Sequence, residues 1–158
     1  MHHLLYEHRE RVLTGSWTPQ HGVEVASSTL PAPWLIALDR LGHDLHVRHY
    51  GSRIVHIDFA AMHDPDGGAV WLESAVTVEG RKPDGLGGNG TGAYFDDDVE
   101  SVLVSMADLV QLQVARAHTA WPWGDEGGVM APQLVDGVAV WIDRTGRSTP
   151  IGDLVESR

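Results

Sequence analysis

The strongest pattern of apolar and polar positions lies between Phe95 and Pro122. Apolar side chains recur there at steps of three and four, which places them on one face of an α-helix. They are Val99, Val102, Leu103, Met106, Leu109, Val110 and Val114. The aspartates at 96–98 can cap free N–H groups, and Pro122 disfavours helical geometry at the residue before it. The pattern predicts a helix of about 22 residues that ends near Ala120.

Alternating apolar and polar residues predict a β-hairpin formed by Leu45–Tyr50 and Ile54–Ala60. The loop between these strands has either two or three residues. A two-residue loop would place the apolar side chains of the second strand on the same face as polar side chains of the first. A three-residue loop, Gly51–Arg53, keeps apolar residues with apolar residues, so we favour that register.

A third strand is predicted at Ala69–Glu79, after a turn at Met62–Gly68. The three strands would form an antiparallel meander, and the long helix is its natural cover. The apolar face of the helix either packs on this sheet or mediates self-assembly. The sequence therefore predicts the α+β fold class, with a three-stranded meander covered by a long helix.

The segments before the meander give weaker patterns. Leu4–Leu13 predicts a short helix that Gly15 ends, and Ser16–Leu30 is typical of a connection with at most a short strand. Trp34–Leu41 fits a short helix or a buried strand, because periodicity does not separate the two at this length. Prolines before this segment and Gly42 after it favour the helix.

A second, smaller unit is predicted near the C-terminus. Asp136-Gly137 is a favoured dipeptide for a two-residue hairpin, and the apolar run Val138–Ile142 follows it. Ser148–Ile151 can add a short third strand. We therefore expect residues 1–122 to form an α+β domain and residues 123–158 to form a small β appendage.

Composition excludes several classes of protein. The chain has 158 residues, a formal net charge of −11 and no cysteine, which excludes disulfides and cysteine nucleophiles. An acidic surface argues against nucleic-acid binding, which needs Lys and Arg to neutralise phosphates. No apolar run is long enough to span a membrane, and the N-terminus turns charged too early for a signal peptide. We expect a cytoplasmic protein, or one incorporated into an intracellularly assembled particle.

Four segments in the last third of the chain carry a resemblance: Val110–Gln113, Trp121-Pro122, Asp136–Arg147 and Ile151–Leu154. They resemble the ends of small uncharacterised proteins from actinobacteria and their phages, many of which carry a zinc-ribbon-like tail. This chain lacks the Cys and His ligands of that tail and has Asp143-Arg144 where the ribbon has Cys-Pro. The resemblance implies a metal-free ribbon that docks on its own domain or on a partner. Such a ribbon would be held by Trp141, Val138, Val140 and Ile151.

The best candidate for chemistry is a metal site formed by His46, His56 and Asp58. In the favoured register His46 lies opposite Asp58, about 5 Å away at Cβ, and Arg48 lies opposite His56. Two imidazoles and a carboxylate can hold a divalent metal with open positions, as hydrolytic sites need. The alternative is a half-exposed sheet face on which a histidine and an aspartate share a hydrogen bond.

A glycine-rich segment, Gly85–Gly90, matches the pattern G-x-G-x-x-G. A dinucleotide site needs this turn directly before a helix whose N-terminus receives the pyrophosphate. Here five residues separate Gly90 from Asp96, and three carboxylates at the start of the helix would repel a phosphate. We therefore expect a loop and no cofactor.

Together these patterns favour a non-enzymatic structural or interaction protein, such as a phage or actinobacterial assembly component. It would act through a protein partner or through self-association. One alternative is a small metal-dependent hydrolase that uses His46, His56 and Asp58. Another is an acidic inhibitor of a basic partner protein.

Overall fold

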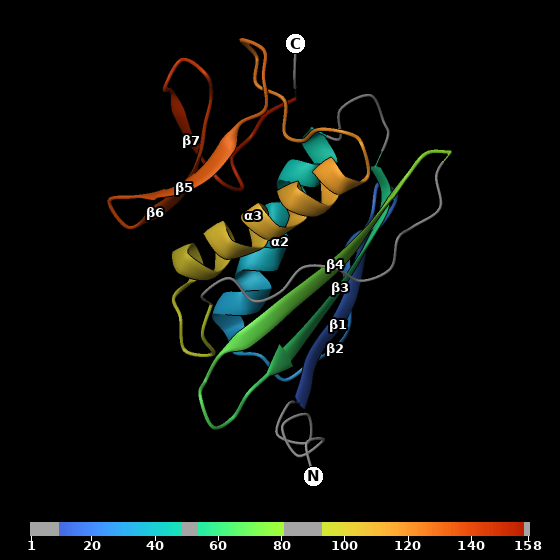
Figure 1. The fold of residues 1–158 in the computed structure, drawn as a ribbon, viewed down its shortest axis with the longest axis vertical. Helices are drawn as coiled ribbons and strands as arrows, with labels where there is room; N and C mark the ends of the chain where they lie inside the picture. The colour runs from blue at the N-terminus through green and yellow to red at the C-terminus, as the bar shows by residue number, and fades with distance from the viewer. Residues whose placement is uncertain (1–9, 49–53, 81–92, 157–158) are drawn as a thin grey trace.

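The computed structural model describes residues 10–48, 54–80 and 93–156. These residues form two antiparallel β-sheets with two helices between them (Figure 1). The larger sheet has the strand order β2-β1-β3-β4, and the smaller sheet has the order β5-β6-β7. The predicted α+β class is confirmed, but the larger sheet has four strands rather than the predicted three.

The elements have the following bounds. The larger sheet contains β1 (Glu10–Thr18), β2 (Gly22–Ser28), β3 (Ile54–His63) and β4 (Val70–Val78). The helices are α2 (Ala32–Val47) and α3 (Val99–Arg116). The smaller sheet, called the C-terminal sheet below, contains β5 (Ala131–Val135), β6 (Val138–Ile142) and β7 (Ser148–Pro150).

The additional hairpin β1–β2 lies where a helix end and a connection were predicted. Glu10–Leu13 belongs to β1, so this part of the predicted helix is wrong, and the earlier residues of that helix lie outside the described residues. Gly15 lies within β1, and the small residue suits this position because a Cβ there would lie 3.0 Å from the Glu24 carbonyl oxygen of β2. Gly22, at φ +66°, supplies the left-handed conformation that the turn into β2 requires.

Helix α2 is longer than predicted and replaces the first strand of the predicted hairpin. It continues through Gly42 to Val47, so the strand assignment of Leu45–Tyr50 is wrong at its described positions. Gly42 does not end the helix; it allows α2 to approach β2. A Cβ at Gly42 would lie 2.5 Å from Cγ2 of Val23. The loop Gly51–Arg53 and the glycine-rich segment Gly85–Gly90 lie outside the described residues.

Helix α3 is the long helix that the sequence predicts, and it is shorter at both ends. Asp98 is the N-cap residue, and its side chain accepts a hydrogen bond from the Ser101 N–H at 3.0 Å. Hydrogen bonding with Ser101 lowers the pKa of the Asp98 carboxyl. The helix ends at Arg116 rather than near Ala120, because His118 adopts a left-handed conformation with φ 63°.

Two predicted hairpins are confirmed. β3 and β4 pair in an antiparallel register, and the buried side chains of β4 include Val70, Leu72 and Val76. β5 and β6 pair from Val135 opposite Val138. The two loop residues between them have φ angles of 51° and 80°, as the favoured two-residue hairpin turn requires.

A single apolar core connects both sheets and both helices. It includes Trp17 and Ile57 of the larger sheet as well as Trp141 of the C-terminal sheet and Ile151, which directly follows β7, and all four side chains are fully buried. Trp141 also contacts Trp121 edge-to-face, with 5.2 Å between the ring centroids. The C-terminal sheet therefore packs against the two helices rather than standing apart from them.

Candidate interaction surface

The structure does not bring the three predicted metal ligands together. His46 lies on α2, whereas His56 and Asp58 lie on β3. Asp58 has Ser16 and Ala75 as its cross-strand neighbours, so the predicted pairing of Asp58 with His46 is wrong. The physical reason is that the run before Val47 is helical, which leaves β3 to pair with β1 and β4.

His56 and Asp58 project from the face of the larger sheet opposite to the helices, because the alternate residues Ile57 and Phe59 are buried in the core. The His56 Nε2 and Asp58 Oδ1 atoms are 2.8 Å apart, and both side chains are substantially exposed. Within residues 10–48, 54–80 and 93–156, no group of three His, Asp or Glu side chains is arranged to hold a metal ion. The arrangement is an exposed histidine–aspartate pair on a flat sheet face.

A buried carboxylate joins the C-terminal sheet to α2. Asp44 is fully buried and accepts hydrogen bonds from Trp141 Nε1 at 2.8 Å, from the Gly152 N–H at 2.7 Å and from the Leu154 N–H at 3.2 Å. The His43 ring lies 2.9 Å from the same carboxylate. No sequence motif singles out Asp44. Its one signal is an acidic residue at the centre of an apolar helix face, between Leu41 and Leu45.

A second polar contact joins the C-terminal sheet to both helices. Arg40 of α2 forms an ion pair with Glu100 of α3 and donates a hydrogen bond to the Ile151 carbonyl. Glu100 in turn accepts a hydrogen bond from the Ala139 N–H at the start of β6. The Arg40 guanidinium lowers the pKa of the Glu100 carboxyl, so the ionised form is the one that this contact favours.

Arg48 supplies the third polar contact and corrects another prediction. It was expected opposite His56 on the sheet, but its buried guanidinium lies at the C-terminal end of α2. There it donates hydrogen bonds to the carbonyls of Val155 and Trp123 and forms an ion pair with Asp125 at 3.2 Å. The chain after α3 is thus attached at both of its ends.

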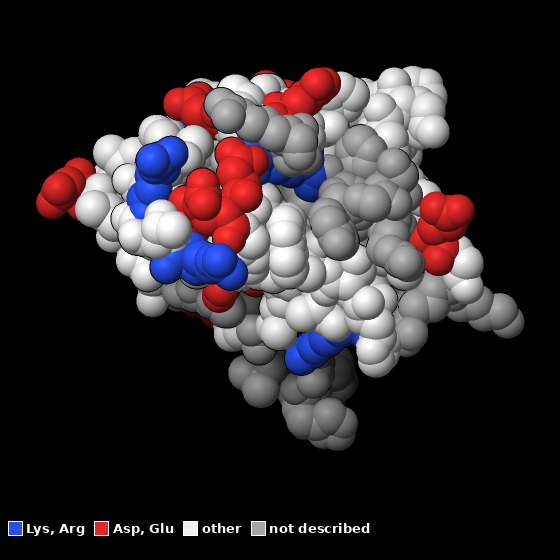
Figure 2. Space-filling view, turned by 90° about the horizontal axis from the view of Figure 1, so that it is seen from above, with Lys and Arg blue, Asp and Glu red and all other residues white. Residues whose placement is uncertain are grey.

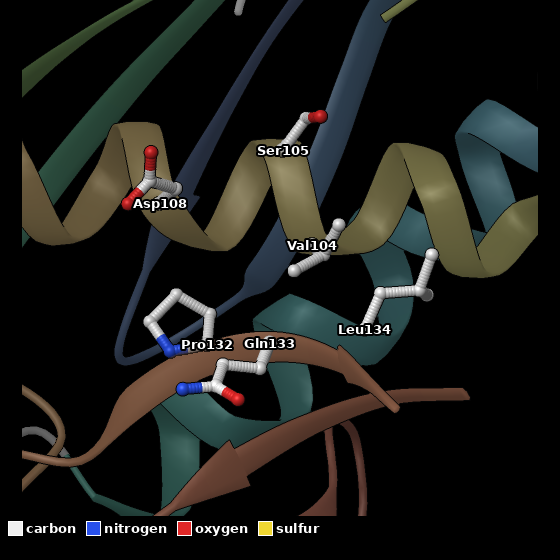
Figure 3. A pocket seen from close by; sticks show the side chains of 6 residues that line it. All are labelled: Val104, Ser105, Asp108, Pro132, Gln133 and Leu134. Carbon is white, nitrogen blue, oxygen red and sulfur yellow. The ribbon is translucent and has the colours of Figure 1, made fainter. Parts of the chain in front are cut away.

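A groove of about 460 Å³ runs between α3 and β5. Figure 3 shows Val104 pointing from α3 toward β5, and Pro132 and Leu134 pointing from β5 toward α3. Ser105, Asp108 and Gln133 complete the lining. The groove is open to solvent and has apolar side chains on both walls, with one carboxylate beside them.

Exposed apolar side chains are concentrated in the part of the chain that follows Pro122. Half of the large apolar side chains that are exposed among the described residues lie after Pro122, in the linker, the C-terminal sheet and the residues that follow it. They are Trp123, Val129, Leu134, Val135, Val138 and Val155. Leu112, on the exposed side of α3, is also 48% exposed. Of the four residues expected to hold the ribbon, Val138 is therefore exposed, whereas Trp141, Val140 and Ile151 are buried.

Charges on this end of the molecule are mixed rather than uniformly acidic. Figure 2 looks down on the end that carries the C-terminal sheet, and acidic and basic side chains alternate on its left side. Next to them lies a broad area without charged side chains. This end of the molecule therefore places uncharged area beside side chains of both signs, a combination that is common in protein interfaces (Figure 2).

No family model, no curated protein and no solved structure matches this chain. The resemblance of its last third to actinobacterial and phage proteins stays a prediction. Neither α2 nor α3, the helices in the described part of the chain, is long and apolar enough to cross a membrane.

Proposed function

We propose that this is a non-enzymatic interaction protein that binds another protein through the C-terminal sheet and the linker before it. The observation that carries the proposal is the concentration of exposed apolar side chains there, from Trp123 to Val138. Isolated exposed apolar residues are ordinary, whereas several of them in one small unit favour a binding role for that unit. Assembly proteins, the class favoured by the sequence, work in this way.

The attachment of the C-terminal sheet supports the same proposal. Asp44, Arg40 and Arg48 fix the sheet through directional hydrogen bonds, in addition to the apolar contacts of Trp141 and Ile151. A surface held in one orientation loses little conformational entropy when a partner binds. The exposed apolar residues are therefore presented on a preorganised support.

Site-specific photo-cross-linking tests the proposal. A photoreactive benzoylphenylalanine replaces Val138, on the proposed surface, in the cells that naturally make the protein. The matched control carries the same group at Val25, a strand valine of the larger sheet with similar exposure, 43% against 39%. We expect a discrete protein adduct from position 138 and none of that mass from position 25. Equal adducts from both positions, or adducts from position 25 only, would contradict the proposal.

A second candidate, an acidic inhibitor of a basic protein, is favoured by one observation. The face of the larger sheet opposite to the helices carries Asp58, with Glu24 and Glu73 on neighbouring strands, and the cross-strand neighbour Ser16 is small. A basic partner bound there would dissociate as salt is raised, because exposed charges are screened. Asp58→Asn would weaken that complex and leave the position-138 adduct unchanged.

A further inference from the structure

The outer edge of β5 carries unpaired backbone groups in the described part of the chain. β5 is the terminal strand of its sheet, and its hairpin begins with Val135 opposite Val138. In a two-residue hairpin the first pair exchanges both hydrogen bonds, and alternate residues then direct their backbone groups outward. The outward groups are therefore the N–H and C=O of Leu134 and the C=O of Pro132.

Pro132 limits how much of this edge can pair. Proline has no N–H, so only Leu134 among the outward residues offers both a donor and an acceptor. A partner strand would therefore exchange its two hydrogen bonds at one position, opposite Leu134. The edge fits a short extended segment rather than a long added strand.

The groove lies where the side chain of that partner residue would point. Leu134 is paired with Ala139 and Pro132 with Trp141, and Ala139 and Trp141 are fully buried in the core that the helices share. Leu134 faces the same side yet is 47% exposed, because the groove beneath it is open. Directly opposed residues in a sheet project to the same face, so a side chain opposite Leu134 would enter the groove beside Val104 (Figure 3).

Charge selects among the possible occupants of this groove. Asp108 is the one acidic or basic residue in its lining, and the chain carries a formal net charge of −11. A second copy of the chain would bring further negative charge, whereas a segment with Lys or Arg would be attracted to Asp108. In an extended segment, residues two apart point to the same side, so the basic residue would stand two positions from the apolar one.

We propose that β5 and the groove bind an extended segment of a partner protein by strand addition. A large apolar side chain opposite Leu134 fills the groove, and a Lys or Arg two residues away contacts Asp108. The proposal rests on the proposed function and specifies the partner's chemistry. Strand addition to an exposed sheet edge, with alternate side chains placed in pockets, is a general mode of peptide recognition.

The probe is the peptide acetyl-Arg-Thr-Leu-Thr-Arg-amide, which presents the same pattern in either strand direction. It is titrated into ¹⁵N-labelled protein and followed by amide chemical shifts. We expect saturable shifts centred on Leu134, Val135 and Ser105. Asp108→Asn should weaken binding about threefold, as expected for one exposed charge, whereas Asp39→Asn on the exposed side of α2 should not change it.

Two altered peptides test the strand addition itself. Methylating the leucine nitrogen removes the donor to the Leu134 carbonyl and should weaken binding at least about threefold. Replacing both arginines with glutamate should abolish the saturable shifts. Absence of saturable shifts with the parent peptide, or equal binding of the methylated peptide, would overturn the proposal.

A second copy in the groove is also distinguishable. Native mass spectrometry of the protein alone would then show a dimer that Leu134→Asp dissociates, and this result would overturn the peptide proposal in favour of self-pairing. A position-138 adduct together with failed peptide binding would leave the proposed function standing and remove only this inference. If neither the position-138 adduct nor peptide binding is observed, both the proposed function and this inference are overturned.

Discussion

The two sheets of this protein are held in different ways. The larger sheet has strands of seven to ten residues and is covered by the helices through apolar contacts such as those of Trp17 and Ile57. The C-terminal sheet has shorter strands, of three to five residues. It depends on Trp141 and Ile151 together with the directional contacts of Asp44 and Arg40. Buried apolar area stabilises both sheets, and hydrogen bonds to single polar groups such as the Asp44 carboxylate stabilise the C-terminal sheet in addition.

The largest effect that distinguishes the two sheets is expected from Asp44→Asn. An amide has one acceptor oxygen where the carboxylate has two, so donors from Trp141, Gly152 and Leu154 cannot all be satisfied. We expect a loss of about 2–4 kcal/mol in the free energy of unfolding, measured in urea. Amide hydrogen exchange should show the C-terminal sheet losing protection first.

The matched control for that substitution is Asp39→Asn, an exposed carboxylate on the same helix, which should change stability by less than about 0.5 kcal/mol. If amide hydrogens of both sheets lose protection from exchange equally in Asp44→Asn, the two sheets unfold as one unit. That result would contradict the claim that they are held in different ways.

A smaller effect, confined to the larger sheet, is expected from Gly42→Ala. The added methyl group would lie 2.5 Å from Cγ2 of Val23, and overpacking of this kind costs about 1–3 kcal/mol. Removing the opposing methyl groups with Val23→Ala should recover stability in the double mutant, which thermal unfolding can measure. An additive double mutant would show that the contact between α2 and β2 is not the cause.

The next effect is a dependence on pH. The Arg40 hydrogen bond lowers the pKa of Glu100 below its usual value of 4.5, so its contribution to stability is complete above that value and is lost as the pH falls through the lowered pKa. Glu100→Gln removes this contribution, so the variant should lose less stability than the original protein between about pH 5 and about pH 3. The difference should be below about 1 kcal/mol, because the pair is partly exposed. Identical pH profiles would mean that the pair contributes nothing to stability.

The smallest effect is expected at the proposed binding surface. Leu134→Ser removes an apolar side chain that is 47% exposed and should change the free energy of unfolding by less than about 0.5 kcal/mol. Leu38→Ala, in the core beneath α2, should cost about 2–5 kcal/mol in the same urea experiment. A large effect of Leu134→Ser would assign this residue to folding rather than to binding.

Local sequence patterns predict those elements whose signals are local. The three- and four-residue spacing of α3, the alternation along β4 and the Asp136-Gly137 turn each identify their element. Each signal lies within the element that it predicts, and the tertiary contacts of these elements agree with it. The confirmed elements are all of this kind.

The incorrect predictions concern residues whose role is set by distant contacts. Gly15 and Gly42 resemble helix stops, but each is small because β2 passes close to it. Asp44 resembles a surface residue, although its partners lie about a hundred positions further along the chain. The predicted pairing of His46 with Asp58 requires that both lie on strands. His46 lies on α2 instead, because the helix continues through Gly42.

The partners of Asp44 also impose an order on biosynthesis. The groups that donate to the carboxylate, on Trp141, Gly152 and Leu154, lie 97 to 110 positions after Asp44 in the chain. At a translation rate of about 5–20 residues per second, α2 waits roughly 5 to 20 seconds for the groups that satisfy it. During that interval the Asp44 carboxylate must stay hydrated, so the side of α2 that carries Asp44 cannot pack into the core. Completion of the native packing is therefore linked to the arrival of the C-terminal sheet.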